Sequence, residues 1–511
     1  MKKIFKEILA FFNKDKWSSE GIFALFFAAV LVFNIMLTIV VEAFGLYLSP
    51  KDTNDYSISG NTDHLFDEAI KEEKKIKISF CLDKDGIEKH ASGQLVHATV
   101  KEFQERYPTL VEIDYINVLT RRNKDGKLVD LGKYQKDMRG NETKVLKTSV
   151  IFECGENYRV ITDRSTSAGF ADFYTLSSSN QLTSYNGEEV VAAMMSWVLS
   201  YDAENPKVAF FTQYHGETSD PSFANLLACA GYYVDVLDLK TIDNVPDEAA
   251  MVVISNPRAD FERGAEGSGI DSEIEKLRAY LDRGGNLLVT LDPYVKKLEE
   301  LEGFIAEYGI SLASTSEDAA RPLRKIVKDY SGSVMLDGFT LVAEYADSEL
   351  AKEISGRVSE YSDGGIIIRE ASALELFGNA KPLLTSSGAS VLEANGKTLD
   401  RSGSYAIAAY SDKTYDNGKT SRLLVIPSVY IAASDALVSR EYSNKDFIYA
   451  IFEKYFGSGV APYGCNDVLF ETSTLENLTM RKARIYTALI MAVPVALAVT
   501  GAVIIVKRRQ R

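Results

Sequence analysis

The sequence predicts an α/β fold, with a Rossmann-like parallel-sheet domain and a smaller α/β lobe between two transmembrane helices. Three observations support this prediction. Strands and helices alternate between residues 188 and 456, which is typical of a parallel sheet covered by helices on both faces. Shorter alternating segments precede them at 75–187, and an apolar stretch without charge lies near each end of the chain.

The two apolar stretches are long enough to cross a membrane. The first, Gly21 to Val41, contains no Asp, Glu, Lys or Arg, and a bilayer core requires about 20 such residues. A cleaved signal peptide is the alternative, but its apolar region is only about 7–15 residues long. The second, Ile485 to Val506, contains Pro494, which transmembrane helices tolerate. We predict transmembrane helices at 21–48 and 485–506.

Basic residues beside the spans predict their orientation. Several lysines precede the first span, and the cluster from Lys507 to Arg511 follows the second. Basic residues at span ends favour the cytoplasmic side. We expect a two-pass protein of the cell (cytoplasmic) membrane, with residues 49–484 extracytoplasmic and cytoplasmic segments at 1–20 and 507–511.

Composition narrows the classes of function. The chain has 511 residues and a net charge of −15, and the acidic excess lies in the region between the spans. Such a surface argues against nucleic-acid binding, which favours clustered lysine and arginine. The four cysteines are far apart and form no C-x-x-C pair, so we expect buried free thiols, although one or two disulfides are an alternative. They are Cys81, Cys154, Cys229 and Cys465.

The smaller lobe is predicted at 75–187, after a polar linker at 49–74. Alternating apolar residues indicate three strands, and a helical period ends at Pro108. The predicted elements are strands from Lys75 to Leu82, Val111 to Val118 and Val145 to Phe152, and a helix from His97 to Tyr107.

The larger domain is predicted at 188–456 and begins with a helix from Glu188 to Tyr201. Asp220 is positioned to cap a helix with Pro221 at its first position and Gly231 at its end. Asp271 or Ser272 caps the next helix. The expected strands are Lys207 to Thr212, Tyr233 to Leu239, Ala250 to Ser255, Leu287 to Leu291 and Arg422 to Pro427; later helices are Glu299 to Tyr308 and Asn444 to Tyr455. We interpret 321–380 as an antiparallel insertion and 457–484 as a membrane-proximal connector.

Short polar groups follow four of these strands. Ligands of open parallel sheets bind beyond the carboxyl ends of the strands, so these groups are candidates for a ligand or partner crevice. Acid–base chemistry there is a second interpretation, and turn geometry is the third, because Asn-Pro and Asp-Pro form turns. The candidate residues are Gln213, His215, Glu217, Asn256, Asp292 and Ser428.

Motifs for other chemistry are absent from the sequence. There is no G-x-S-x-G nucleophile elbow, and the two Gly-Lys-Thr triplets lack the earlier glycine of a phosphate-binding loop. The histidines show no metal-ligand spacing with cysteines or carboxylates. We therefore expect no catalytic residue, no metal and no cofactor in this chain.

Three segments, in the same order, resemble the GldG-like auxiliary proteins of gliding-motility-type ABC transporters. They are Pro206 to Glu217, Val252 to Pro293 and Ser421 to Phe447. One departure is Tyr214, where the family has glycine before the histidine. The resemblance implies a glutamine-amidotransferase-like domain without catalytic residues. It also implies a non-catalytic subunit that works with a multi-span ABC permease and a cytoplasmic ABC ATPase.

The leading hypothesis is therefore a membrane-anchored accessory subunit of an ABC transport complex, whose large extracytoplasmic domain contacts substrate or partner. A stand-alone envelope protein that binds or senses a ligand is the first alternative. A membrane-tethered hydrolase is the second.

Overall fold

The computed structural model describes the part of the chain between the two predicted spans. The described residues are 57–162, 170–176, 182–218, 221–262, 272–315, 323–331, 333–334, 337–399, 402–416, 418–439, 441–459, 461–465 and 467–470. The spans predicted at 21–48 and 485–506 and the cytoplasmic segments at 1–20 and 507–511 lie outside these residues. Within them, no helix combines the length and apolarity needed to cross a bilayer.

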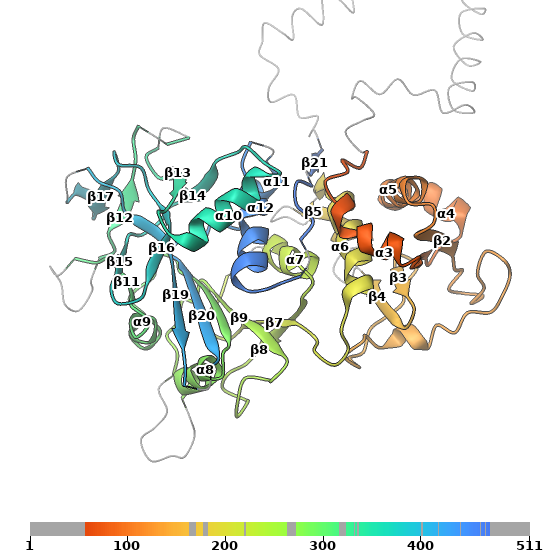
Figure 1. Cartoon of the computed structure of the whole chain (residues 1–511), viewed down its shortest axis with the longest axis horizontal. Helices are drawn as coiled ribbons and strands as arrows, with labels where there is room; N and C mark the ends of the chain where they lie inside the picture. The colour runs from red at the N-terminus through yellow and green to blue at the C-terminus, as the bar shows by residue number, and fades with distance from the viewer. Residues whose placement is uncertain are drawn as a thin grey trace, which may run out of the picture. The chain divides into compact units, whose positions relative to one another are not determined.

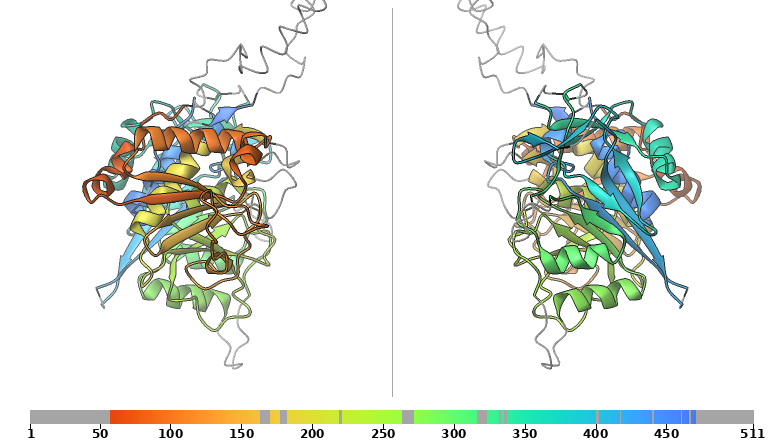
Figure 2. Two further views of the ribbon diagram at one scale, coloured as in Figure 1. Left: turned by 90° about the vertical axis from the view of Figure 1, so that its right-hand side faces the viewer. Right: turned by 90° about the vertical axis from the view of Figure 1, so that its left-hand side faces the viewer.

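Four strands form the sheet of the smaller lobe, in the order β2-β1-β3-β4. Strand β1 (Ile76–Phe80) is parallel to β2 (Val111–Tyr115) and antiparallel to β3 (Val150–Cys154), which pairs with β4 (Asn157–Ile161). Helix α5 (Gly93–Arg106) lies over this sheet (Figure 2). It begins four residues before the predicted start at His97.

Residues 49–74 were predicted to be a polar linker, but their described part is folded into the smaller lobe. Phe66 is fully buried against Phe103 and Tyr107, at ring-centroid distances of 6.2 and 5.2 Å. Asp63 accepts hydrogen bonds from Tyr107 and Arg106. One large aromatic side chain therefore holds a segment whose composition is mostly polar.

The remaining elements of the smaller lobe are η2 (Asp63–Leu65), α3 (Asp67–Lys71), α4 (Lys84–Glu88), η3 (Lys133–Gln135), η4 (Ala171–Phe173), β5 (Tyr174–Leu176) and β6 (Leu182–Tyr185).

Helix α6 (Gly187–Ser200) connects the lobe to the larger sheet. It packs against α5, β3 and β4 of the smaller lobe and also against α7 (Pro221–Cys229). Apart from its two ends, its residues are almost all buried, which its run of Val, Ala and Met requires. The helix is thus shared by both lobes, and residues 56–470 form one compact unit.

The larger sheet is mixed, with nine strands in the order β14-β13-β16-β19-β20-β10-β9-β7-β8 and β11 and β15 beside them (Figure 1). Its parallel half consists of β8 (Tyr233–Leu237), β7 (Val208–Thr212), β9 (Ala249–Ser255), β10 (Asn286–Thr290) and β20 (Thr420–Ile426). These strands are at the predicted places within a few residues at each end. The parallel-sheet domain of a mixed α/β fold is thus present.

The second half of the sheet is antiparallel and includes the segment interpreted as an insertion at 321–380. Strand β19 pairs antiparallel with β20, and β16, β13 and β14 follow outward. The segment therefore extends the main sheet. The strands of this antiparallel half are β11 (Ile310–Leu312), β13 (Thr340–Tyr345), β14 (Ile366–Arg369), β15 (Leu374–Leu376), β16 (Lys381–Thr385) and β19 (Ala406–Thr414). Strands β12 (Ile326–Lys328), β17 (Val391–Ala394) and β18 (Lys397–Thr398) form a separate three-stranded sheet.

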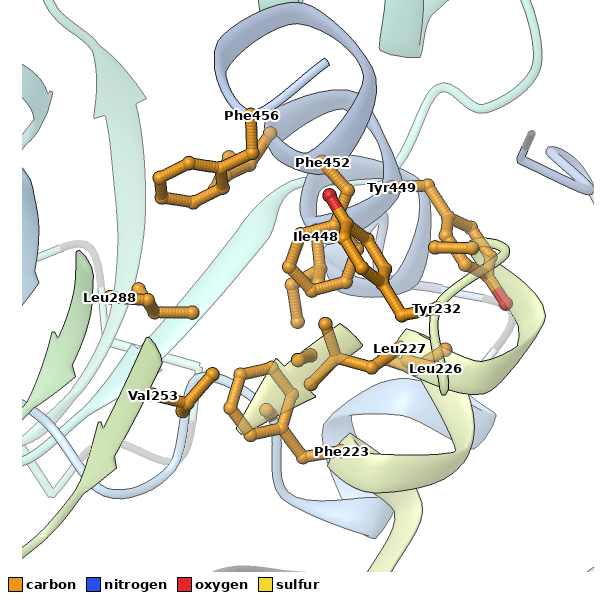
Figure 3. Packing of buried hydrophobic residues seen from close by; sticks show 14 of the residues in the cluster. Phe223, Leu226, Leu227, Tyr232, Val253, Leu288, Ile448, Tyr449, Phe452 and Phe456 are labelled. Carbon is orange, nitrogen blue, oxygen red and sulfur yellow. The ribbon is translucent and has the colours of Figure 1, made fainter. Parts of the chain in front are cut away.

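Helices cover both faces of the parallel half. Figure 3 shows Phe223 of α7 and Ile448 of α12 (Asn444–Ala450) facing Val253 and Leu288 of the sheet. Helices α8 (Glu273–Asp282) and α9 (Glu299–Ala306) lie together on the other side (Figure 1). Ser272, one of the two predicted caps, accepts the Glu275 amide of α8 at 3.1 Å. The other helices are α10 (Glu349–Ser359), α11 (Ser434–Val438) and η5 (Ile451–Tyr455).

Residues 457–484 were predicted to be a membrane-proximal connector, but their described part packs into the folded unit. Tyr463 and Cys465 are buried, and β21 (Val468–Leu469) pairs antiparallel with β6 of the smaller lobe. The segment therefore belongs to the folded unit.

All four cysteines are free thiols; three are buried and Cys154 is half-buried, which confirms the expectation of free thiols.

Candidate functional site

The carboxyl ends of four parallel strands meet at one edge of the larger sheet. Strands β7, β9, β10 and β20 are adjacent, and Thr290 at the end of β10 is level with Ser255 of β9 and Ile426 of β20. The residues that follow these strands include all six candidates from the sequence. They are Gln213, His215 and Glu217 after β7, Asn256 after β9, Asp292 after β10 and Ser428 after β20.

His215 is the centre of a charged cluster at this edge. Its Nδ1 lies 3.0 Å from Oε1 of Glu217, and its Nε2 lies 3.0 Å from Oε2 of Glu273, the first residue of α8. Its ring stacks on Phe261, with centroids 4.0 Å apart and an interplanar angle of 7°. The side chain is 1% exposed. We call these four residues the His215 cluster.

The electrostatics of the His215 cluster favour a protonated imidazole. Burial alone would lower the pKa of His215, but hydrogen bonds to Glu217 and Glu273 outweigh it and raise the pKa to about 9. At neutral pH both ring nitrogens then donate to carboxylates. An imidazole in this state has no free nitrogen for a substrate proton, so the cluster joins the loop after β7 to the start of α8.

Backbone contacts hold two loops of this edge together. The carbonyl oxygen of His215 accepts the amides of Arg258 and Ala259, both at 2.8 Å. Asn256 donates from Nδ2 to the carbonyl oxygen of Thr218 at 3.0 Å. Its Oδ1 is buried and has no hydrogen-bond partner in the described part of the chain. His215, Glu217 and Asn256 thus lie in one connected group.

The other three candidates take part in separate local contacts. The backbone amide of Gln213 donates to the carbonyl oxygen of Leu237 at 3.2 Å, and the Gln213 side chain is half-buried. Asp292 accepts the Tyr294 amide at 2.9 Å, which is the turn geometry weighed from the sequence. Ser428 is fully buried and donates to the carbonyl oxygen of Arg369 at 2.6 Å.

A cleft of about 970 Å³ lies just beyond this edge. One wall is the segment from Pro293 to Glu300, and the other comes from β12 and β17. Tyr294, 60% exposed, contributes an aromatic side chain. Charged residues of both signs complete the lining. None of the six candidates lines the cleft, although its first wall follows β10, one of the strands whose ends were singled out.

Sequence reasoning missed Glu273 and Phe261. An acidic residue in the first turn of a predicted helix is a recognisable signal, because carboxylates favour helix N-termini. Phe261 gave no such signal, because its role depends on the fold bringing it under the imidazole. Within the described residues, no group of three His, Cys, Asp or Glu side chains is arranged to hold a metal ion.

A second charged cluster lies inside the molecule. Lys445 of α12 donates from Nζ to Glu189 of α6 at 2.8 Å and to Asp467 at 2.5 Å. Burial would lower the pKa of Lys445, but the two carboxylates raise it; burial raises the pKa of Glu189. Asp467 also accepts the hydroxyls of Thr175 and Ser184, at 2.8 and 2.7 Å. The cluster ties the C-terminal segment to both lobes.

Comparison with known proteins gives only distant similarities. No family model and no curated protein matches the chain. Among solved structures, the mmIFT52 N-terminal domain is 16% identical, covering 50% of this chain and 98% of that one, with a TM-score of 0.35. A glutamine amidotransferase from Thermotoga maritima is 13% identical, covering 49% and 99%, with a TM-score of 0.28. PurLQS from the same organism is 12% identical, covering 49% and 98%, with a TM-score of 0.27.

Proposed function

We propose that this chain is a non-catalytic, membrane-anchored accessory subunit of an ABC transport complex. Its extracytoplasmic domain would contact the substrate or a partner. A separate multi-span permease and a cytoplasmic ATPase would supply the pathway and the energy. The proposal rests on the resemblance of three ordered segments to the GldG-like auxiliary proteins and on the two charge-free apolar stretches with basic flanks.

The observation that carries the non-catalytic part of the proposal is the His215 cluster. His215 has the residue type and the position of a general base, at the carboxyl edge of a parallel sheet. Both of its ring nitrogens are engaged by Glu217 and Glu273, and the side chain is buried. A base must have a nitrogen within reach of the substrate proton, and this geometry offers none. The arrangement supports a rigid scaffold.

The two ends of the described unit meet, which supports anchoring by two spans in one membrane. Asn61 donates from Nδ2 to the carbonyl oxygen of Gly464 at 3.0 Å. Ser59 donates from its amide and its hydroxyl to Glu188, both at 2.8 Å, so the start of the unit is fixed to α6. Strand β21 fixes the other end to β6. Because both ends lie together, short chain segments are enough to reach two neighbouring membrane helices.

Purification of the chain from its native membrane tests the proposal. The full chain, solubilised in a mild non-ionic detergent, should bring with it an ABC ATPase and a multi-span membrane protein in constant ratio. A variant that ends at residue 484, without the second predicted span, is the control and should lose the permease. Purification of the full chain without either partner, under conditions that keep other membrane complexes intact, counts against the proposal.

A stand-alone ligand-binding protein is the second candidate function. The cleft of about 970 Å³ beside Tyr294 favours it, because ligand sites have volumes of about 300–1,000 Å³. The two candidates differ in the purification experiment, since the stand-alone protein would be recovered without transporter subunits. A membrane-tethered hydrolase predicts, in contrast, that His215→Gln abolishes a measurable activity.

A further inference from the structure

Two arginines contact the same aromatic ring but differ in their partners. The guanidinium carbons of Arg139 and Arg159 lie 5.4 and 5.2 Å from the ring centroid of Tyr233. Arg139 is paired with Asp235 at 3.3 Å and with Glu248 at 2.6 Å. Arg159 forms no ion pair with a described carboxylate.

The guanidinium of Arg159 is covered and only partly satisfied. It lies 5.0 Å from the ring centroid of Trp197 on α6 and donates from Nη2 to the carbonyl oxygen of Tyr232 at 3.3 Å. Its Nη1 is buried and has no hydrogen-bond partner among the described residues. Burial lowers the pKa of Arg159, and charges at longer range oppose this only in part. Buried charges in proteins are normally paired, but Arg159 has no ion-pair partner among the described residues.

Arg159 lines a cavity of about 460 Å³ between the two lobes. Strands β4 and β5 and helices α6 and α7 form its walls. Val190, Met194 and Ala224 give it an apolar side. Ser222 and Asn225 come from the first turns of α7, where the helix dipole is positive. Asp172, an exposed residue whose charge partly offsets the effect of burial on the pKa of Arg159, also lines the cavity.

We propose that this cavity binds a small amphipathic organic anion. The guanidinium of Arg159, which lines the cavity, would hold the carboxylate or phosphate group of the ligand, and the apolar part would lie against Val190 and Met194. Three features agree on this ligand class: an unpaired guanidinium, the positive end of a helix, and an apolar wall within a volume suited to a small molecule. The site is independent of the proposed transport role, because it lies within one chain.

Titration calorimetry on the full chain in lipid nanodiscs tests the site. The probes are hexanoate, hexyl phosphate and 1-hexanol, which share one apolar tail and differ in the head group. We expect saturable binding of at least one anion and only nonspecific partition of the alcohol. The stronger of the two anions identifies the head group. If neither anion binds more tightly than 1-hexanol, the proposal is overturned.

Two substitutions separate the site from general folding effects. Arg159→Gln should weaken anion binding about tenfold or more, because it removes a charge-assisted hydrogen bond. Arg139→Gln, on the other arginine beside Tyr233, is the matched control and should change affinity by less than about twofold. Ala228→Leu keeps Arg159 and fills the cavity, so it should also weaken binding. If Arg159→Gln fails to fold, Ala228→Leu decides, and unchanged binding in either folded variant overturns the proposal.

Discussion

Replacement of His215 by glutamine should make the protein less stable at pH 6 and remove most of the pH dependence of its stability between pH 6 and 9. A pKa of about 9 in the folded protein, against 6.5 in an unfolded chain, means that the folded state binds the proton more tightly. The corresponding stabilisation is about 3 kcal/mol. It is fully present below pH 6.5 and is lost as the pH rises through about 9.

Urea unfolding of the full chain in mild detergent, followed by the fluorescence of buried Trp197, measures this effect. A Trp17→Phe background removes the other tryptophan of the chain. The unsubstituted His215 protein should lose about 2–3 kcal/mol of unfolding free energy from pH 6 to 9, and His215→Gln should lose much less. Exposed His64→Gln is the control and should leave the slope unchanged. Equal slopes in the His215→Gln variant and its parent would refute the assignment of a protonated His215 held by Glu217 and Glu273.

Three further substitutions test other parts of the structure. Lys445→Met should lower the unfolding free energy by about 3–5 kcal/mol in the same urea assay, because it leaves buried Glu189 and Asp467 without their cation. Gly309→Ala should lower the melting temperature, because its backbone has a φ of +84° and a new Cβ would lie 2.1 Å from a backbone carbonyl oxygen. Tyr214→Gly should raise stability by about 1 kcal/mol in thermal unfolding, because Tyr214 has a φ of +78° and its side chain is 68% exposed.

The backbone of Tyr214 has a positive φ, at the residue that departs from the pattern of the family that the sequence resembles. The GldG-like family has glycine before the histidine, and the positive φ at this position is one that glycine adopts without strain. This chain therefore has a tyrosine at a position whose backbone angle favours glycine. A sequence comparison can register the substitution, but only the backbone angle gives its physical meaning.

Local patterns in the sequence located most elements of the larger domain. Strands β7, β9 and β10 are short, continuous apolar runs, and α8 carries its cap and its apolar spacing within ten residues or so. Such signals depend on neighbours along the chain, so the order of elements and the parallel half of the sheet could be predicted. The boundary errors of α5 and β3 are a few residues, since helix and strand ends depend on contacts outside the segment.

The candidate site was predicted only in outline. The rule that polar groups gather beyond the carboxyl ends of parallel strands placed His215, Glu217 and Asn256 correctly at one edge. It could not show that the imidazole is enclosed, because Glu273 is 58 residues away along the chain from His215. The same is true of Arg159, because the absence of a hydrogen-bond partner for its Nη1 among the described residues depends on which distant segments surround it.

The sequence by itself determined the α/β pattern, the acidic balance and the two charge-free stretches, because period, charge and length are local quantities. Tertiary structure alone decided that 321–380 extends the main sheet and that the segment before the second predicted span pairs with β6. It also decided that the imidazole of His215 is held between the carboxylates of Glu217 and Glu273. These outcomes depend on which distant surfaces bury each other. That choice is made by packing and by the pairing of buried charges, which no short window of residues contains.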